Sequence, residues 1–367
     1  MRLSGLWVLL SAPGCDGDPA PDPSYPVVAP EPIATTSVPY TASGSIALLS
    51  NQGTACVAQS YEVRVRCVGR DGSLVGAFGR EGDGPGEFAR LGALVGGRYG
   101  TVGVMDNGSN LFSVFEPGGV FVSDALTPGW ALAVTPAEPF GETVTLVGGL
   151  TRDGREAQGV PGSDHIAFEI DLASGETIRQ EGIPQADVDL ECERRFHAFP
   201  NPAGGWIRVA CRGHLILVAA DGTADGVRSP AYFDELPRER EIARRAGQWD
   251  ALARRPRGPA VRPEWLESYR DSPKFYHLEG ALGRFGPAGH LWIATQRDHN
   301  EFSYLDVFTV RDPAFLGSVK VRDHMKGFDL VGSTLVVLAE RAAGPDDPDG
   351  IPDHAIDWYD VSDLRLR

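Results

Sequence analysis

Twenty consecutive residues read Gly69-Arg-Asp-Gly-Ser-Leu-Val-Gly-Ala-Phe-Gly-Arg-Glu-Gly-Asp-Gly-Pro-Gly-Glu-Phe88. Asp71-Gly72 is a hairpin-turn signal, because glycine adopts a positive φ at no steric cost. Leu74 to Phe78 then predicts a short outer strand. From Gly79 to Gly86 the chain leaves the sheet, since Pro85 has no N–H for a strand ladder. The stretch predicts a unit that closes one small antiparallel sheet and leads to the next, as in a propeller.

The same plan recurs along the chain. Unbroken apolar runs, typical of strands buried on both faces, alternate with glycine-rich turns. We count six units of about 40–50 residues, the size of propeller blades. The fold class is therefore all-β, a six-bladed β-propeller, and we expect Ile46 to Leu49 to complete the last sheet and close the ring. The units cover Ser45–Phe78, Leu91–Ser123, Trp130–Arg179, Phe196–Arg228, Ala281–Val319 and Gly327–Leu366.

Composition sets limits on the partners. The 367 residues are 42% hydrophobic, with 45 Gly and 28 Pro, which suits many short strands joined by turns. The formal net charge is −16. An acidic surface repels phosphate backbones, so nucleic-acid binding is disfavoured and the charge mainly favours solubility. We expect a monomer.

The N-terminus has the features of an export signal. Met1-Arg2 is a minimal basic region, and Leu3 to Leu10 is an apolar run too short to span a bilayer. Ser11-Ala-Pro-Gly-Cys15 resembles a bacterial lipobox, in which the cysteine becomes the lipidated first residue. An ordinary secretory signal is the alternative interpretation. Prolines recur from Cys15 as far as Pro39 and predict an extended polar tether.

The predicted organisation follows from these segments. Residues 1–15 are a signal peptide with a lipobox, 16–42 a disordered tether, and 43–367 the propeller. We expect an exported protein, either a lipoprotein of the bacterial cell envelope held to the membrane only by its N-terminal lipid, or a periplasmic protein.

The cysteines support export independently. Apart from Cys15, four remain in two local pairs, Cys56 with Cys67 and Cys192 with Cys211. Each pair fits neighbouring strands of one hairpin, and an even count fits disulfides in an oxidising compartment. Buried free thiols are the alternative. A zinc site is disfavoured, because no C-x₂-C occurs.

Several motifs carry a family resemblance. Val104-Met-Asp106, Asn110 to Phe115 and Glu116-Pro-Gly-Gly119 resemble the repeat of NHL-type propellers. Gly79 to Phe88 resembles the linker of bacterial six-bladed β-propeller lipoproteins, and Gly286-Pro-Ala-Gly289 ahead of Leu291-Trp-Ile is similar to a turn of such propellers. The resemblance implies the fold and export, and it implies no particular activity.

A helical insertion interrupts the repeats between units four and five, over about 233–275. Asp234 to Leu252 has helical apolar spacing with Asp234 as the expected cap, and Pro263 to Arg270 begins a second short helix. The resembled family often carries an insert here. The insert either covers a sheet edge or determines partner specificity, since insertions on rigid scaffolds often carry recognition.

No sequence motif for catalysis is convincing. The Gly79 to Phe88 stretch lacks the Gly-Lys-Ser/Thr of a phosphate loop, and neither a Gly-x-Ser-x-Gly elbow nor a His-Glu-x-x-His occurs. Asp346, Asp347, Asp349 and Asp353 lack the spacing and terminal Glu of an EF-hand, so we interpret them as a solvated acidic loop.

Two functional hypotheses follow, and a structural module within a larger envelope assembly is a third interpretation. The first is a non-enzymatic binding scaffold for a protein or small-molecule ligand, with no cofactor. The second is a calcium-dependent hydrolase of the lactonase or gluconolactonase type, which on this fold holds calcium in the central channel. The polar residues near inner-strand ends are interpreted as turn residues or satisfied polar groups rather than ligands; they are Asp106, Asn107, His197, His290 and Asp329.

Overall fold

The computed structural model describes fourteen parts of the chain. They are residues 24–39, 41, 43–59, 62–127, 131–134, 139–149, 165–183, 197–210, 212–219, 223–253, 263–278, 283–299, 302–341 and 352–366.

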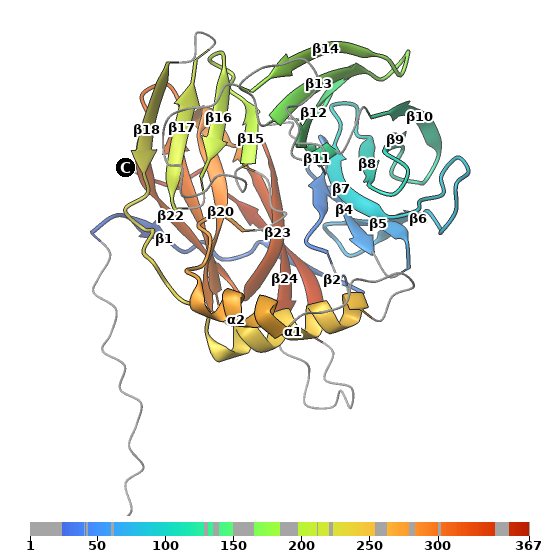
Figure 1. Cartoon of the computed structure of the whole chain (residues 1–367). Helices are drawn as coiled ribbons and strands as arrows, with labels where there is room; N and C mark the ends of the chain where they lie inside the picture. Colours follow the sequence, from blue (N-terminus) through green and yellow to red (C-terminus); the bar gives the residue numbers. More distant parts are fainter. Residues whose placement is uncertain are drawn as a thin grey trace, which may run out of the picture.

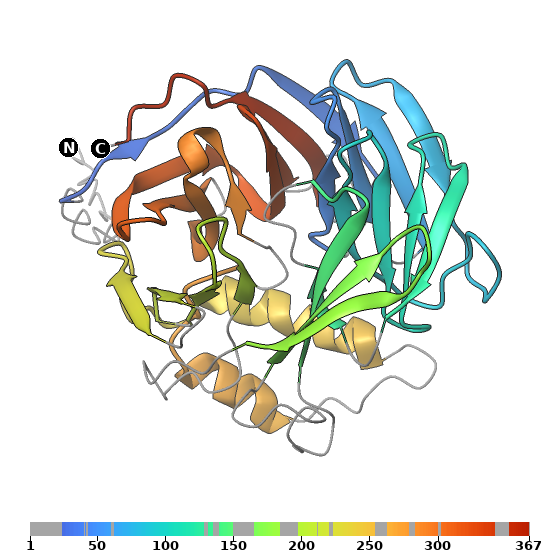
Figure 2. The same ribbon diagram turned by 90° about the horizontal axis from the view of Figure 1, so that it is seen from above.

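Within these ranges the strands form six sheets arranged as a ring, which confirms the predicted six-bladed propeller (Figures 1 and 2). Four sheets follow the chain in order. The first sheet contains β3 (Ile46–Leu48), β4 (Thr54–Gln59), β5 (Arg64–Gly69) and β6 (Leu74–Phe78), and the second contains β7 (Leu91–Gly96), β8 (Val102–Asp106), β9 (Leu111–Phe115) and β10 (Phe121–Leu126). The third sheet contains β11 (Ala131–Val134), β12 (Thr143–Gly149), β13 (His165–Asp171) and β14 (Thr177–Gly182). The fourth contains β15 (His197–Pro200), β16 (Trp206–Val209), β17 (His214–Val218) and β18 (Ala224–Arg228).

The last two sheets each add a strand from the N-terminus. In the first, β1 (Val27–Val28) joins β19 (Arg284–Phe285), β20 (Leu291–His299), β21 (Phe302–Thr309) and β22 (Ala314–Arg322). In the second, β2 (Ala34–Val38) joins β23 (His324–Val331), β24 (Thr334–Arg341) and β25 (Asp353–Asp360).

The ring is closed by β2 and not by the strand that we expected. β2 pairs antiparallel with β25 as the outer strand of the last sheet, and Figure 2 shows the two lying side by side. Residues 46–48 instead begin the next sheet as β3. Our prediction that 16–42 is a tether is thus wrong for 34–38. The reason is physical: Thr36 and Val38 are buried, and the prolines flank the strand without interrupting it.

A second N-terminal contact lies on the neighbouring sheet. β1 pairs parallel with β22, and the Ser318 N–H donates to the Pro26 carbonyl at 2.9 Å. Arg297 donates to the Tyr25 hydroxyl at 2.5 Å, and the Tyr25 ring packs edge-on against Phe315. The described chain is therefore fixed to the propeller from Tyr25 onward.

Apolar side chains between neighbouring sheets hold the ring together. One cluster joins the last sheet to the first, where Trp358 and Leu338 pack with Leu48 and Val57, all fully buried. Burying a side chain of this size stabilises by about 1.5–3 kcal/mol. The Gly79–Phe88 loop belongs to such a cluster too, because Phe88 is inserted among residues of two sheets.

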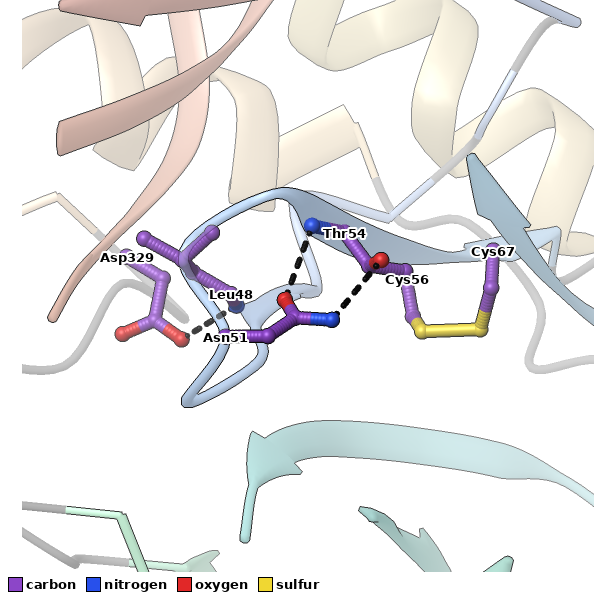
Figure 3. The surroundings of a disulfide bond; sticks show 6 residues. All are labelled: Leu48, Asn51, Thr54, Cys56, Cys67 and Asp329. Atoms are coloured by element: carbon purple, nitrogen blue, oxygen red, sulfur yellow. Dashed lines mark hydrogen bonds between the residues drawn. A yellow bond between two sulfur atoms is a disulfide. The ribbon is translucent and has the colours of Figure 1, made fainter. Parts of the chain in front are cut away.

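The Cys56–Cys67 disulfide is confirmed (Figure 3). The two residues lie directly opposite each other on β4 and β5, with a Cα–Cα distance of 4.0 Å, and both are fully buried. Cys15, Cys192 and Cys211 lie outside the described residues, so the second pair and the lipidation site stay predictions.

The helical insertion is confirmed between β18, the last strand of the fourth unit, and β19, the first strand of the fifth. It contains α1 (Glu239–Ala253) and α2 (Pro263–Asp271), and both lie on one face of the ring (Figure 1). Asp234 is not the cap. The Glu241 side chain instead accepts from the Arg238 N–H at 2.8 Å, which satisfies a free donor at the helix start.

Candidate functional site

A cavity of about 760 Å³ opens on the face of the ring opposite the helices. It is built from turns of four sheets: β11–β12, β15–β16, β19–β20 with β21–β22, and β23–β24. The placement follows from β23, since the end of this strand lines the cavity while His324 at its start contacts Arg244 of α1 at 2.8 Å. The lining residues are Pro139, Pro202, Ala203, Phe285, Gly286, Ala288, Gly289, His290, Thr309, Val310, Arg311, Asp312, Leu330, Val331 and Gly332.

The β19–β20 turn forms one wall. Pro287 occupies its first central position, Ala288 has a φ of 59°, and the Gly289 N–H donates to the Gly286 carbonyl at 3.1 Å. A Cβ at Gly286 would lie 2.5 Å from a Leu330 methyl and 2.6 Å from the Trp292 Nε1. Only glycine fits there, so the Gly286–Gly289 motif fixes the wall by close packing.

Unengaged polar side chains gather on the same sheet. His290, Arg311 and Asp312 line the cavity, and their side chains make no hydrogen bond or ion pair within the described residues. Burial lowers the pKa of His290, so its imidazole is neutral at pH 7 and can both donate and accept. The other walls combine apolar side chains such as Phe285 with the polar backbone groups of the turns. The arrangement suits a ligand that has both apolar and polar surface.

A buried ion pair lies beside the cavity wall. The Arg284 Nε–H donates to Asp329 Oδ1, and the Leu48 N–H donates to the other Asp329 oxygen at 2.7 Å. Figure 3 shows the Asp329 carboxylate directed at Leu48. The inner strands of three sheets, β19, β23 and β3, are thereby joined. Phe285 and Leu330 are the next residues along their strands, and both line the cavity.

Two of the polar residues considered as calcium ligands form hydrogen bonds with other groups of the protein. Asp106 is buried and accepts from the N–H groups of Ala89, Arg90 and Gly108, each at 2.8 Å, and from the Ser109 hydroxyl at 2.7 Å. Asn107 is a turn residue whose N–H donates to the Arg90 carbonyl.

The remaining candidates are dispersed. Asp329 belongs to the ion pair, His290 lines the cavity, and the His197 side chain lies outside the described residues. The acidic residues Asp346, Asp347 and Asp349 also lie outside the described residues. Among the described residues, no group of three or more His, Cys, Asp or Glu side chains is placed to hold a metal ion. No described helix is long and apolar enough to cross a membrane.

Sequence reasoning identified the turn that forms a wall of the cavity but not the cavity itself. The Gly286–Gly289 turn and His290 were noted in the sequence, whereas Arg311, Asp312 and Arg284 were not. The available signal was the position of these residues at or beside the turns of one unit. That signal does not say which turns meet around the ring.

No known protein family and no curated protein matches this chain in sequence. Solved structures match only distantly. A Bacteroides fragilis protein that is provisionally named as exported is 9% identical, with a TM-score of 0.46 over 93% of this chain and 99% of that one. The WD40 repeats of RRP9 are 8% identical, with a TM-score of 0.48 over 90% and 99%. Virginiamycin B lyase from Staphylococcus aureus is 11% identical, with a TM-score of 0.44 over 88% and 98%. These likenesses carry no information about function.

Proposed function

We propose that this chain is an exported, lipid-anchored β-propeller that acts as a binding scaffold and takes a small-molecule ligand in the cavity. The single observation that carries the proposal is a cavity lined by turns of four sheets. Its volume of about 760 Å³ is within the usual range for small-molecule sites. Residues far apart in the sequence converge on it, and the side chains of His290, Arg311 and Asp312 on one of its walls are unengaged within the described residues.

The export part of the proposal is supported by the sequence and by one disulfide. The N-terminal segment has the pattern of a signal with a lipobox at Cys15. The Cys56–Cys67 bond is of the kind that persists in oxidising compartments. Labelling with a fatty acid in a bacterial host tests it. We expect label and membrane association that Cys15→Ser abolishes; a soluble, unlabelled wild-type protein would contradict the lipid anchor.

Ligand-observed NMR with a small-molecule library tests the binding site. Ala203 is exposed on the cavity rim, so Ala203→Trp should fill the space and abolish most binding. Ala224 is exposed on the outer strand β18, and Ala224→Trp is the matched control that should bind as the wild type does. Compounds that bind wild type and Ala203→Trp equally would place the site elsewhere. A library without any binder would overturn the small-molecule function.

The insert stays the predicted determinant of protein partners. Phe233, Leu236 and Trp265 are exposed large apolar residues in or beside its helices. Their exposure supports a contact surface, and hydrogen–deuterium exchange with a bound ligand separates this surface from the cavity.

A further inference from the structure

Two turns of one sheet bring polar side chains together on a wall of the cavity. β20 and β21 pair antiparallel up to this end of the sheet, so His290 and Thr309 lie side by side. The Cβ atoms of such cross-strand neighbours are about 5 Å apart. Arg311 and Asp312 follow in the same β21–β22 turn, and all four residues line the cavity.

Both turns are held in place by hydrogen bonds that leave these side chains unused. The Thr309 hydroxyl donates to the Asp312 carbonyl and accepts from the Ala314 N–H at 3.0 Å. A backbone hydrogen bond of 2.9 Å to the His290 carbonyl closes the β19–β20 turn. The side chains of His290, Arg311 and Asp312 make no hydrogen bond or ion pair within the described residues, so they remain for a ligand.

The three side chains supply donors and acceptors without a net charge. Arg311 only donates, the ionised Asp312 only accepts, and the neutral imidazole of His290 does both. Arg311 and Asp312 are the charged residues among those that line the cavity, so the charges of this wall cancel. An ion of either sign would be attracted by one of them and repelled by the other. Hydroxyl groups, which both donate and accept, match this wall without a charge.

We propose that the cavity binds a neutral saccharide through hydrogen bonds between its hydroxyl groups and the side chains of His290, Arg311 and Asp312. This inference rests on the proposed binding function and specifies its ligand class. Neighbouring hydroxyls of a sugar ring can donate to the two oxygens of one carboxylate. The C–H groups of the ring need apolar contact, which lining residues such as Phe285 and Val331 offer.

Titration with neutral sugars and their charged counterparts, followed by ligand-observed NMR at pH 7, tests the inference. The probes are glucose, galactose and mannose, each with its uronic acid and its amino sugar. These counterparts keep the ring and add a negative or a positive charge. We expect neutral sugars to bind wild type severalfold more tightly than either charged form, and Ala203→Trp to abolish this binding.

Substitutions that change the charge of the wall make the test specific. Asp312→Asn loses one acceptor and leaves the wall cationic, so neutral sugars should bind about tenfold more weakly and the uronic acids should become the tighter ligands. Arg311→Gln leaves the wall anionic and should shift the preference toward the amino sugars. Asp124→Asn, at an exposed position on the outer strand β10, is the matched control and should behave as wild type.

His290 allows a test by conservative rescue. His290→Leu removes the donor and the acceptor, and it should weaken the binding of neutral sugars by about threefold to tenfold. His290→Gln restores one group of each kind and should recover most of the affinity. Thermal melting confirms that each variant is folded.

Three results would overturn the inference: no sugar of the panel binds, neutral and charged sugars bind wild type equally, or the preference is unchanged in both charge variants. The broader library separates this failure from that of the proposed function. If other compounds bind and Ala203→Trp abolishes their binding, the cavity is a binding site for a different ligand class.

Discussion

At the scale of single residues, the buried carboxylates of this propeller bind protein groups. Asp106 accepts four hydrogen bonds from its own turn and the preceding loop. Asp357, fully buried, accepts from Thr35 at 2.6 Å and from Arg322 and Arg341. These residues stabilise the turns and strand contacts of the ring, which explains acidic residues near strand ends without invoking a ligand.

Replacing Asp106 by Ala should therefore destabilise the fold strongly. The change leaves three backbone N–H groups without their acceptor in a nearly closed site, and we expect a loss of roughly 2–4 kcal/mol in the free energy of unfolding. Urea unfolding measures it. Asp124→Ala, at an exposed position on β10, should change stability by less than about 0.5 kcal/mol. Equal effects of the two substitutions would contradict this role for Asp106.

Glu340 gives the protein a specific acid sensitivity. Burial alone would raise its pKa, but the hydrogen bond from His354 and the charges of Lys326 and Arg244 outweigh burial and lower the pKa of Glu340 from 4.5 to about 2. The carboxylate is thus stabilised in the folded state. Its contribution is complete above pH 4.5 and is lost as the pH falls through about 2.

A Glu340→Gln variant tests this titration. The shift corresponds to about 3 kcal/mol, so the variant should be less stable than wild type by about that amount at pH 7, and the difference should shrink toward pH 2. Denaturant unfolding between pH 2 and 7 gives the profile. Glu116→Gln, at an exposed turn, should follow the wild-type profile. A pH-independent difference for Glu340→Gln would refute this assignment.

At the scale of elements, the N-terminal strands determine whether the ring is closed. β2 covers the edge of β25, Thr36 accepts from the Trp358 indole N–H at 3.2 Å, and Thr35 engages the buried Asp357. The two threonines lie more than 300 residues from their partners in sequence. The sheet can therefore be completed only after the last strand is available.

Deletion of residues 1–40 should expose the β25 edge and weaken the whole ring. We expect the melting temperature to fall by roughly 5–10 °C, with aggregation through the open edge. Deletion of residues 1–23 should leave the melting temperature unchanged, because both N-terminal strands remain. Differential scanning calorimetry compares the two. Indistinguishable melts of the two deletions would show that β2 is dispensable for closure.

How much the sequence revealed depended on whether the signal was local. Hairpin turns such as Asp71-Gly72, apolar runs, and the spacing of Cys56 and Cys67 are local features, and they predicted the blades and one disulfide correctly. β2 was missed because its pairing is long-range and the prolines around Ala34–Val38 suggested a tether. The Arg284–Asp329 pair was missed for a related reason, since it depends on which inner strands become neighbours after closure.

At the scale of the whole molecule, the ring has two different faces. Helices α1 and α2 lie on one (Figure 1), and the cavity opens on the other, with β23 running between them. The two faces correspond to two places where a partner could bind. We propose small-molecule binding at the cavity face, and the insert is the predicted surface for protein contacts.

Hydrogen–deuterium exchange with and without a ligand from the library screen tests this assignment most directly. We expect slower exchange in the peptides that contain residues 286–290, 309–312 and 330–332, and unchanged exchange in 239–253 and 263–271. Protection confined to the two helices, with the cavity turns unaffected, would contradict the proposal that this propeller binds its ligand in the cavity.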